Sequence, residues 1–284
     1  MKKRVLITGG QGILGQELYN ILSSNCICLV TDRNDMDILD ENLVTETFQD
    51  FSPQVVIHCA AYTAVDKAES ERNICYQINV EGTRNIAKAC NFFACELVFI
   101  STDYVFSGEG TNPLEVDDPK KPVNYYGETK LLAEQIVSQY CTKFYIVRTS
   151  WLFASHGKSF IAAMMSKQHQ KEINVVDDQI GSPTYAPFLA EMLSALIKTG
   201  KYGVYHATCE GFCSWAEFAE EIFRSIGRSD IQINRIKSSQ YDSLAERPLN
   251  SRLSKHSLDT ANIPRLPHWR QGILAYLDNI NHKF

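Results

Sequence analysis

Short apolar runs alternate with segments of helical spacing along the first half of the chain. The runs are nearly continuous in β-branched and other apolar residues, as in strands that are buried on both faces of a sheet. The intervening segments carry apolar residues three or four positions apart, which is typical of amphipathic helices. This alternation predicts an α/β fold with a doubly wound parallel sheet between two layers of helices. The expected strands cover residues 4–8, 27–31, 55–58, 97–101 and 144–148, and the clearest helices cover 14–22, 79–90 and 126–139.

A glycine-rich turn joins the first expected strand to the first expected helix. It runs Thr8-Gly9-Gly10-Gln11-Gly12-Ile13-Leu14-Gly15, so that Gly9, Gly12 and Gly15 are three residues apart. Glycines at this spacing permit a tight turn, let the backbone approach a pyrophosphate and bring the helix close to the strand. The free N–H groups of the helix N-terminus attract the anion. The turn predicts a Rossmann-like dinucleotide site, with an ordinary glycine-rich βα turn as the alternative.

An aspartate stands at the end of the second expected strand. Asp32 follows the central glycine at about the 20-residue distance where a carboxylate accepts hydrogen bonds from the adenosine ribose. Such a carboxylate repels the 2′-phosphate of NADP, whereas the adjacent Arg33 could bind that phosphate. NADPH and NADH therefore both remain open, and Asp32 could instead be a turn residue. Further dinucleotide contacts are expected from Asp37-Ile38 and from Ala60-Ala61-Tyr62-Thr63, which follows the third strand.

The regular alternation weakens near Trp151. Beyond it, loops with glycine and proline separate helices that we expect near residues 159–165, 188–198 and 215–226. We expect a dinucleotide-binding domain over residues 1–150, with some later segments packing back on it, and mainly a smaller substrate-binding lobe over residues 151–284. Residues 238–252 are polar and include a proline, which is typical of a long functional loop.

Charge and hydrophobicity argue against two classes of partner. The net charge is −5, and no cluster of Lys and Arg could follow a phosphate backbone, so we expect no nucleic acid. The longest apolar runs are far shorter than the ~20 residues that span a bilayer. The apolar stretch 5–7 is also too short for a signal peptide. We expect a cytoplasmic protein without a membrane span. Its nine cysteines are scattered, and Cys26, Cys28 and Cys59 in the strand-like segments are expected to be small reduced core residues.

A tyrosine and a lysine four residues apart follow the fourth expected strand. Tyr126 and Lys130 would lie on one face of a helix. A phenol, with an ordinary pKa of about 10, is a poor acid at neutral pH unless a nearby ammonium stabilises its phenolate. Thr102, at the end of the fourth strand, would hydrogen-bond a substrate carbonyl while Tyr126 delivers a proton. The three residues predict carbonyl reduction or its reverse, although the Tyr-Lys pair alone also fits a solvated helix face.

The chain resembles the extended short-chain dehydrogenase/reductase superfamily and, within it, the dTDP-4-dehydrorhamnose reductase family. The segments that carry the resemblance are residues 60–69, 101–106, 148–151, 178–184 and 247–252. The resemblance covers essentially the whole chain. It implies that NADPH or NADH reduces C4 of a nucleotide sugar, dTDP-4-dehydro-L-rhamnose, giving dTDP-L-rhamnose for cell-surface polysaccharide, with Thr102, Tyr126 and Lys130 as the catalytic residues.

The resemblance also implies which residues bind cofactor and substrate. Trp151 would present a flat apolar face to a deoxysugar, unless it is a core residue. Arg247 would offer a planar fork to the substrate diphosphate, unless it is a surface charge. The cofactor contacts, partly from the motifs above, are Gly9, Gly12, Ile13, Leu14, Gly15, Asp32, Arg33, Asp37, Ile38, Ala60, Ala61, Tyr62, Thr63, Tyr126 and Lys130, and the substrate contacts are Val65, Thr102, Asp103, Trp151 and Arg247.

Some members of the family bind magnesium through carboxylates and dimerise around it. Glu17 matches one such position, but Pro187 stands where a second carboxylate is expected. We therefore expect no metal site and interpret Glu17 as a helix-surface residue. A monomer and a homodimer both remain open.

Two other functions remain open from the sequence. One is a related nucleotide-sugar epimerase, or a reductase that makes another deoxysugar. The other is a non-catalytic binding module, because the regulatory subunit of methionine adenosyltransferase resembles this family. The presence of Thr102, Tyr126 and Lys130 together argues against the second alternative.

Overall fold

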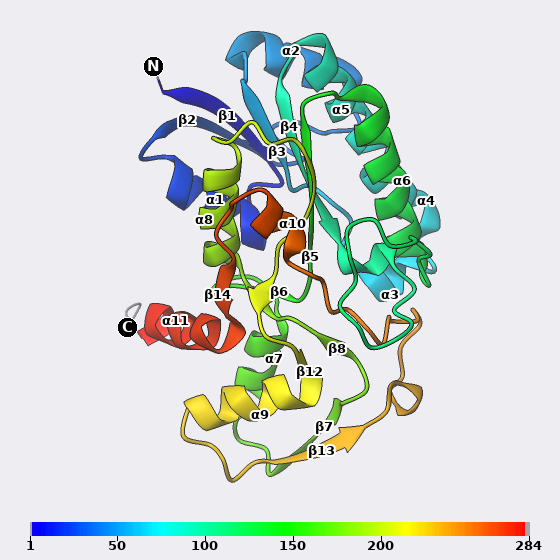
Figure 1. Cartoon of the computed structure of the whole chain (residues 1–284), viewed down its shortest axis with the longest axis vertical. Helices are drawn as coiled ribbons and strands as arrows, with labels where there is room; N and C mark the ends of the chain where they lie inside the picture. The colour runs from blue at the N-terminus through cyan, green and yellow to red at the C-terminus, as the bar shows by residue number, and fades with distance from the viewer. Residues whose placement is uncertain (1, 282–284) are drawn as a thin grey trace.

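A computed structural model describes residues 2–281, and a six-stranded parallel sheet forms its centre (Figure 1). The strand order β10-β5-β4-β3-β1-β2 places β1 between β2 and β3, so successive strands are added in opposite directions from β1. The five predicted strands are confirmed to within two residues at each end. The strands are β1 (Lys3–Thr8), β2 (Cys26–Thr31), β3 (Val55–His58), β4 (Glu96–Thr102), β5 (Phe144–Thr149) and β10 (Gly203–His206).

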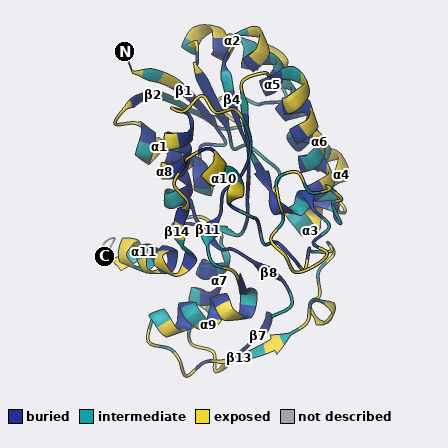
Figure 2. Cartoon of the chain, viewed as in Figure 1, coloured by how far each residue is buried: buried dark blue, intermediate teal, exposed yellow. Residues whose placement is uncertain are grey.

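Helices cover both faces of this sheet, which confirms the doubly wound α/β fold. Val5 and Ile7 pack with α1 (Ile13–Leu22) and α8 (Ala186–Leu196). Leu6, between them in β1, packs on the opposite face. That face is covered by α2 (Glu41–Phe51), α5 (Thr83–Phe92) and α6 (Tyr125–Tyr140). Figure 2 shows the result, with buried strands at the centre and exposed residues on the outer sides of the helices.

A continuous helical region precedes α5 and begins earlier than the sequence predicted. It consists of α4 (Arg72–Tyr76) and a π-helical turn (Gln77–Gly82) that runs into α5. The short helix α3 (Val65–Ala68) lies just before it. Single π-turns are rare and occur often at functional sites. This one brings the buried Asn79 toward the loop after β3.

The remaining elements form a smaller structure next to the carboxyl edge of the sheet (Figure 1). Its longest strand pair is β7 (Glu172–Val176) with β13 (Gln232–Ile236). The other pairs are β6 (Leu152–Phe153) with β9 (Thr184–Tyr185), β8 (Ile180–Gly181) with β12 (Cys213–Ser214), and β11 (Cys209–Glu210) with β14 (Leu266–His268), and the helices are α7 (Phe160–Ser166), α9 (Trp215–Ser225) and α11 (Trp269–Asn281). The short helix α10 (His256–Thr260) instead packs on β10 of the central sheet, where the Ser257 hydroxyl accepts from the His206 N–H at 3.1 Å.

The loop predicted over residues 238–252 is confirmed, since its regular structure is limited to one 3₁₀ turn at Ser238–Gln240 and a single β-bridge between Asn250 and Ile180. It passes from the smaller structure back toward the sheet. All nine cysteines are free thiols, seven of them buried. Over residues 2–281, no helix is both long enough and apolar enough to cross a bilayer.

Candidate active site

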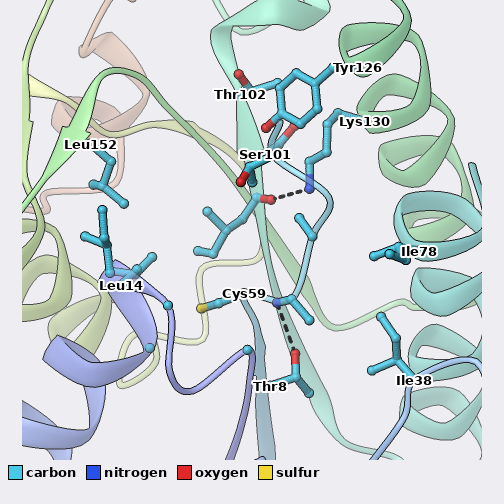
Figure 3. Close-up of a pocket in the computed structure, with 18 of the residues that line it drawn as sticks. Thr8, Leu14, Ile38, Cys59, Ile78, Ser101, Thr102, Tyr126, Lys130 and Leu152 are labelled. Atoms are coloured by element: carbon cyan, nitrogen blue, oxygen red, sulfur yellow. Dashed lines mark hydrogen bonds between the residues drawn. The ribbon is translucent and has the colours of Figure 1, made fainter. Parts of the chain in front are cut away.

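A cavity of about 860 Å³ opens where the parallel strands end. Four threonines that close β1, β2, β4 and β5 line it, namely Thr8, Thr31, Thr102 and Thr149. Figure 3 shows Leu14 and Leu152 on one side of the cavity and Tyr126, Lys130 and Ile78 on the other. The cavity therefore lies at the carboxyl edge of the sheet, where α/β proteins place their ligands.

Most residues that the sequence marked as site residues line this cavity. Tyr62 and Arg247 are the two that do not. Those that do are Gly9, Gly12, Ile13, Leu14, Gly15, Asp32, Arg33, Asp37, Ile38, Ala60, Ala61, Thr63, Val65, Thr102, Asp103, Tyr126, Lys130 and Trp151.

The glycine turn is packed too tightly for side chains. Gly9 has a φ of +68°, and a Cβ there would lie 2.7 Å from the backbone nitrogen of Ala60. A Cβ on Gly15 would lie 2.4 Å from the carbonyl oxygen of Gly9. Gly12 precedes α1 and caps it without a side-chain hydrogen bond, so the first N–H groups of the helix face outward without a side-chain acceptor. The turn thus forms a backbone cradle suited to an anion.

Asp32 is held against this cradle. Its carboxylate accepts a hydrogen bond from the backbone N–H of Gln11 at 2.7 Å. The neighbouring Arg33 side chain is 83% exposed and lies 3.5 Å from Asp37 in a weak ion pair. Ile38 packs against Gly82, where a Cβ would lie 2.4 Å from its Cδ1. One rim of the cavity therefore carries the Asp32 carboxylate, held by a hydrogen bond, beside the solvent-exposed guanidinium of Arg33.

The loop after β3 is fixed by a buried amide. Asn79 accepts a hydrogen bond from the Tyr62 N–H at 2.7 Å and donates to the Tyr62 carbonyl at 3.2 Å. It also donates to the Thr129 hydroxyl of α6 at 3.0 Å. The Tyr62 hydroxyl donates to Glu71 at 2.6 Å, which raises the pKa of Tyr62 to about 12. Tyr62 thus holds the loop in place through its backbone and Glu71, and no local sequence pattern pointed to Asn79.

Lys130 is buried beneath the cavity with a carbonyl as its partner. Its ammonium donates to the backbone oxygen of Ile100 at 2.8 Å and lies 4.0 Å from the centre of the Phe99 ring (Figure 3). Burial lowers the pKa of Lys130 to about 7, and the negative charge of Glu134 opposes this shift.

Tyr126 and Thr102 lie beside Asp103. The pKa of Tyr126 is raised, first by burial and then by the charge of Asp103, while the Thr102 hydroxyl acts in the opposite direction. Thr102 donates to one carboxylate oxygen of Asp103 at 3.1 Å. The Tyr126 ring also meets Tyr104 edge-on, with 6.0 Å between ring centres. The phenol is thus protonated at neutral pH and forms part of the cavity wall.

Asp103 has an unsatisfied oxygen. Its Oδ2 is buried and has no hydrogen-bond partner, and burial raises the pKa of Asp103 to about 6. Because the folded form holds this proton more tightly than the unfolded chain, the carboxyl group stabilises the fold below about pH 4 and loses that contribution as pH rises through about 6.

We therefore expect Asp103→Asn to raise the free energy of unfolding at pH 7 by up to about 3 kcal/mol relative to its effect at pH 4. Urea unfolding of both proteins between pH 4 and 8 measures the difference. If the difference in free energy of unfolding between the two proteins were the same at every pH in this range, the pKa of Asp103 would not be raised by folding.

Arg247 lies in an ion pair outside the cavity lining. Its guanidinium donates to both carboxylate oxygens of Asp66, at 2.6 and 3.1 Å. The pair lowers the pKa of Asp66. Asn124 donates to the carbonyl of Glu246 at 2.8 Å. These contacts hold the loop 238–252 against α3 and the start of α6. Contact of Arg247 with a ligand stays a prediction.

Several lining residues were not predicted as ligands. They are polar or aromatic and come from α4, the π-turn, the last residue of β5 and the segments after it, where local patterns give no sign of a cavity. The principal ones are Asn73, Gln77, Thr149, Ser150, Lys158 and Trp215.

Residues 2–281 contain no group of three or more His, Cys, Asp or Glu side chains placed to bind a metal ion. Glu17 was predicted on the helix surface, but its side chain is only 12% exposed and lies 3.3 Å from His156. That interpretation was wrong, because the later segment 155–158 folds over α1.

Known proteins with similar sequences and structures bear on this site. The family model for the RmlD substrate binding domain matches residues 2–282. The spore coat polysaccharide biosynthesis protein SpsK of Bacillus subtilis is 37% identical over 96% of each chain. The dTDP-4-dehydrorhamnose reductase of Escherichia coli K12 is 34% identical over 97% of each.

A crystal structure of dTDP-4-dehydrorhamnose reductase from Bacillus anthracis in complex with NADP superposes with a TM-score of 0.96. It is 38% identical and covers 98% of this chain and 100% of its own. Family, sequence and structure thus agree over the whole length, and the chain belongs to the dTDP-4-dehydrorhamnose reductase family.

Proposed function

We propose that this protein reduces the C4 carbonyl of dTDP-4-dehydro-L-rhamnose with NADPH or NADH and so forms dTDP-L-rhamnose. The observation that carries the proposal is that Thr102, Tyr126 and Lys130 line the same cavity as the glycine cradle and Asp32. A proton donor, an ammonium and a dinucleotide cradle in one cavity are the parts that carbonyl reduction requires. Membership of the family supports the same assignment.

The residues of the cradle fit a dinucleotide. The space that a Cβ would fill at Gly9 and Gly15 is already taken by backbone, and the N-terminus of α1 offers uncapped N–H groups. We propose that the pyrophosphate lies there and that Asp32 binds the adenosine ribose. When bound, the cofactor supplies the hydride. The remaining proposed contacts are Gly12, Ile13, Leu14, Arg33, Asp37, Ile38, Ala60, Ala61, Tyr62, Thr63, Tyr126 and Lys130.

In the proposed mechanism Tyr126 is the general acid. Burial and the charge of Asp103 raise the pKa of its phenol, so the proton is present at neutral pH but is released only where a positive charge stabilises the phenolate. The Thr102 hydroxyl, which donates to Asp103 in the free protein, would turn to donate to the carbonyl oxygen of the substrate and orient it. The Lys130 ammonium, held by the carbonyl of Ile100, would stabilise the phenolate that remains after transfer.

The substrate sugar would occupy the part of the cavity lined by Val65, Asp103 and Trp151. The free oxygen of Asp103 can accept a hydrogen bond from a sugar hydroxyl, which would satisfy a buried acceptor. We propose Arg247 as a partner of the diphosphate, which requires it to leave Asp66. We also propose that residues 1–150 hold mainly the cofactor and 151–284 mainly the substrate.

The direct test follows the absorbance of NADPH and of NADH after addition of dTDP-4-dehydro-L-rhamnose, generated in place by the upstream dehydratase and epimerase. Rapid oxidation is the expected result and ranks the two cofactors. Cofactor binding without oxidation would reject this substrate and favour another nucleotide sugar or a binding module. Retention of NAD through purification would instead favour an epimerase, which regenerates its cofactor.

We expect Asp32→Ala to weaken NADH binding about tenfold or more and NADPH binding clearly less. Only the unphosphorylated ribose relies on the carboxylate, and a hydrogen bond to a charged group contributes about 1.5–3 kcal/mol. Fluorescence titration of both cofactors measures the difference. Asp32→Asn is the control, because it keeps an oxygen for the Gln11 N–H. Equal losses for both cofactors in Asp32→Ala would mean that Asp32 acts only on the turn.

A further inference from the structure

The segment 178–184 carries part of the family resemblance but has no role in the function proposed above. Its side chains and backbone converge on two tryptophans, Trp151 and Trp215. Both tryptophans line the cavity and both are only partly buried. Trp215 was not predicted as a site residue.

The two indoles are stacked nearly face to face. Their ring centres lie 3.5 Å apart with an angle of 12° between the planes. Trp151 has a φ of +49°, a left-handed conformation that costs about 1–3 kcal/mol for a bulky residue and persists only where the surroundings impose it. This backbone strain at Trp151, a residue that lines the cavity, indicates that the fold imposes the direction of its side chain.

The segment 178–184 holds each indole separately. A Cβ on Gly181 would lie 2.9 Å from Cε2 of Trp151, so only glycine leaves room for that ring. The N–H of Thr184 donates to the Trp151 carbonyl at 3.1 Å. The Nε1 of Trp215 donates to the side-chain oxygen of Gln179 at 3.1 Å. Gly181 and Thr184 therefore restrain Trp151, whereas Gln179 restrains Trp215.

Trp215 is also fixed by its own helix. It is the first residue of α9, whose cap Ser214 accepts from Glu217 N–H at 3.0 Å and donates to Asp177 at 2.6 Å. The Phe160 ring lies 4.6 Å from Trp215, centre to centre. Trp215 thus connects the cavity wall to the interior of the smaller structure.

We propose that Trp215 is a positioning residue that holds the indole of Trp151 as a flat apolar wall for the deoxysugar of the substrate. This inference rests on the proposed function. A ring that is already stacked loses little freedom when a ligand binds, which favours affinity for the sugar. The apolar face and methyl group of a 6-deoxyhexose match such a wall, whereas a fully hydroxylated hexose would leave a hydroxyl unsatisfied there.

The test compares Trp215→Leu, which removes the stack, with Trp215→Phe, which retains an aromatic face. We expect Trp215→Leu to raise KM for the nucleotide sugar about tenfold, equivalent to about 1.4 kcal/mol, with kcat and the NADPH Kd within about twofold of wild type. Trp215→Phe should recover most of the affinity. Two stacked indoles give a circular-dichroism signal that arises from coupling between their electronic transitions. This coupled signal should disappear both in Trp215→Leu and in Trp151→Phe.

The matched control is Trp269→Phe, at the third tryptophan, which is buried and absent from the cavity lining. It should lower Tm and leave KM and the coupled signal unchanged. Loss of NADPH affinity in parallel with KM in Trp215→Leu, or an unchanged KM despite loss of the coupled signal, would overturn the positioning role.

Failure of the proposed function is distinguishable from failure of this inference. If the wild type does not oxidise NADPH with dTDP-4-dehydro-L-rhamnose, the proposed function fails by itself. Calorimetry with dTDP-L-rhamnose on the NADP⁺-loaded protein then decides the role of Trp215. Weaker binding by Trp215→Leu than by Trp215→Phe supports it, and equal or absent binding in wild type and variants rejects it.

Discussion

Replacing Tyr126 with phenylalanine is expected to lower turnover by at least ~10²-fold while leaving the NADPH Kd within about twofold of wild type. The substitution removes one hydroxyl and keeps the ring, including its edge-on contact with Tyr104. The lost hydroxyl is the proposed proton donor, and burial keeps it protonated at neutral pH. Steady-state oxidation of NADPH measures turnover, and fluorescence titration measures cofactor affinity.

Tyr125→Phe is the matched control for this prediction. Tyr125 is adjacent in sequence, but its ring lies under the guanidinium of Arg72, 4.5 Å from ring centre to guanidinium carbon, and is not among the cavity-lining residues. We expect near wild-type turnover for it. Retention of more than about a tenth of wild-type turnover in Tyr126→Phe would reject Tyr126 as the general acid.

The sheet and the glycine cradle could be predicted because their signals are local. An apolar strand such as Val55–His58 can be predicted from its own residues, without knowing which strands lie beside it. The spacing of Gly9, Gly12 and Gly15 likewise indicates a tight turn by itself. The strand β10 (Gly203–His206) was missed because it follows a glycine-containing loop and has only two apolar residues, whereas β3 of the same length has three. Its place in the sheet depends on pairing with β5.

The residues that the sequence missed act through distant contacts. Asn79 hydrogen-bonds both Tyr62 and Thr129, and Thr129 lies 50 residues after Asn79 in the sequence. Asn79 lies in a π-turn, which the spacing of apolar residues does not predict. Trp215 meets Trp151 across 64 positions of the chain. The ion pair between Arg247 and Asp66, 181 residues apart, was likewise not predicted, although Arg247 itself was named as a site residue. Such pairings follow from tertiary packing, which periodicity does not describe.

Lys130 illustrates what the structure adds to a residue that the sequence did single out. The four-residue spacing predicted only that it shares a helix face with Tyr126. The structure shows that the ammonium is buried and donates to the Ile100 carbonyl, and this burial lowers the pKa of Lys130 to about 7. The carboxylate of Glu134, one turn further along α6, favours its charged form. The charge state of the site thus depends on a buried neighbour whose own partner is Arg148.

Arg148→Met is expected to lower the free energy of unfolding by about 3–5 kcal/mol, because it leaves the buried carboxylate of Glu134 without its ion-pair partner. The two side chains are 2% and 6% exposed, and the guanidinium donates to both carboxylate oxygens, at 2.8 and 2.9 Å. Urea unfolding measures the loss, and Arg148→Met/Glu134→Met should recover most of it, since replacing both partners of a buried pair is nearly neutral. Lys88→Met, which breaks an exposed pair with Glu41, should cost less than about 1 kcal/mol. Equal losses in the single and double variants at Arg148 would mean that packing of the arginine stem, rather than its charge, stabilises the junction of β5 and α6.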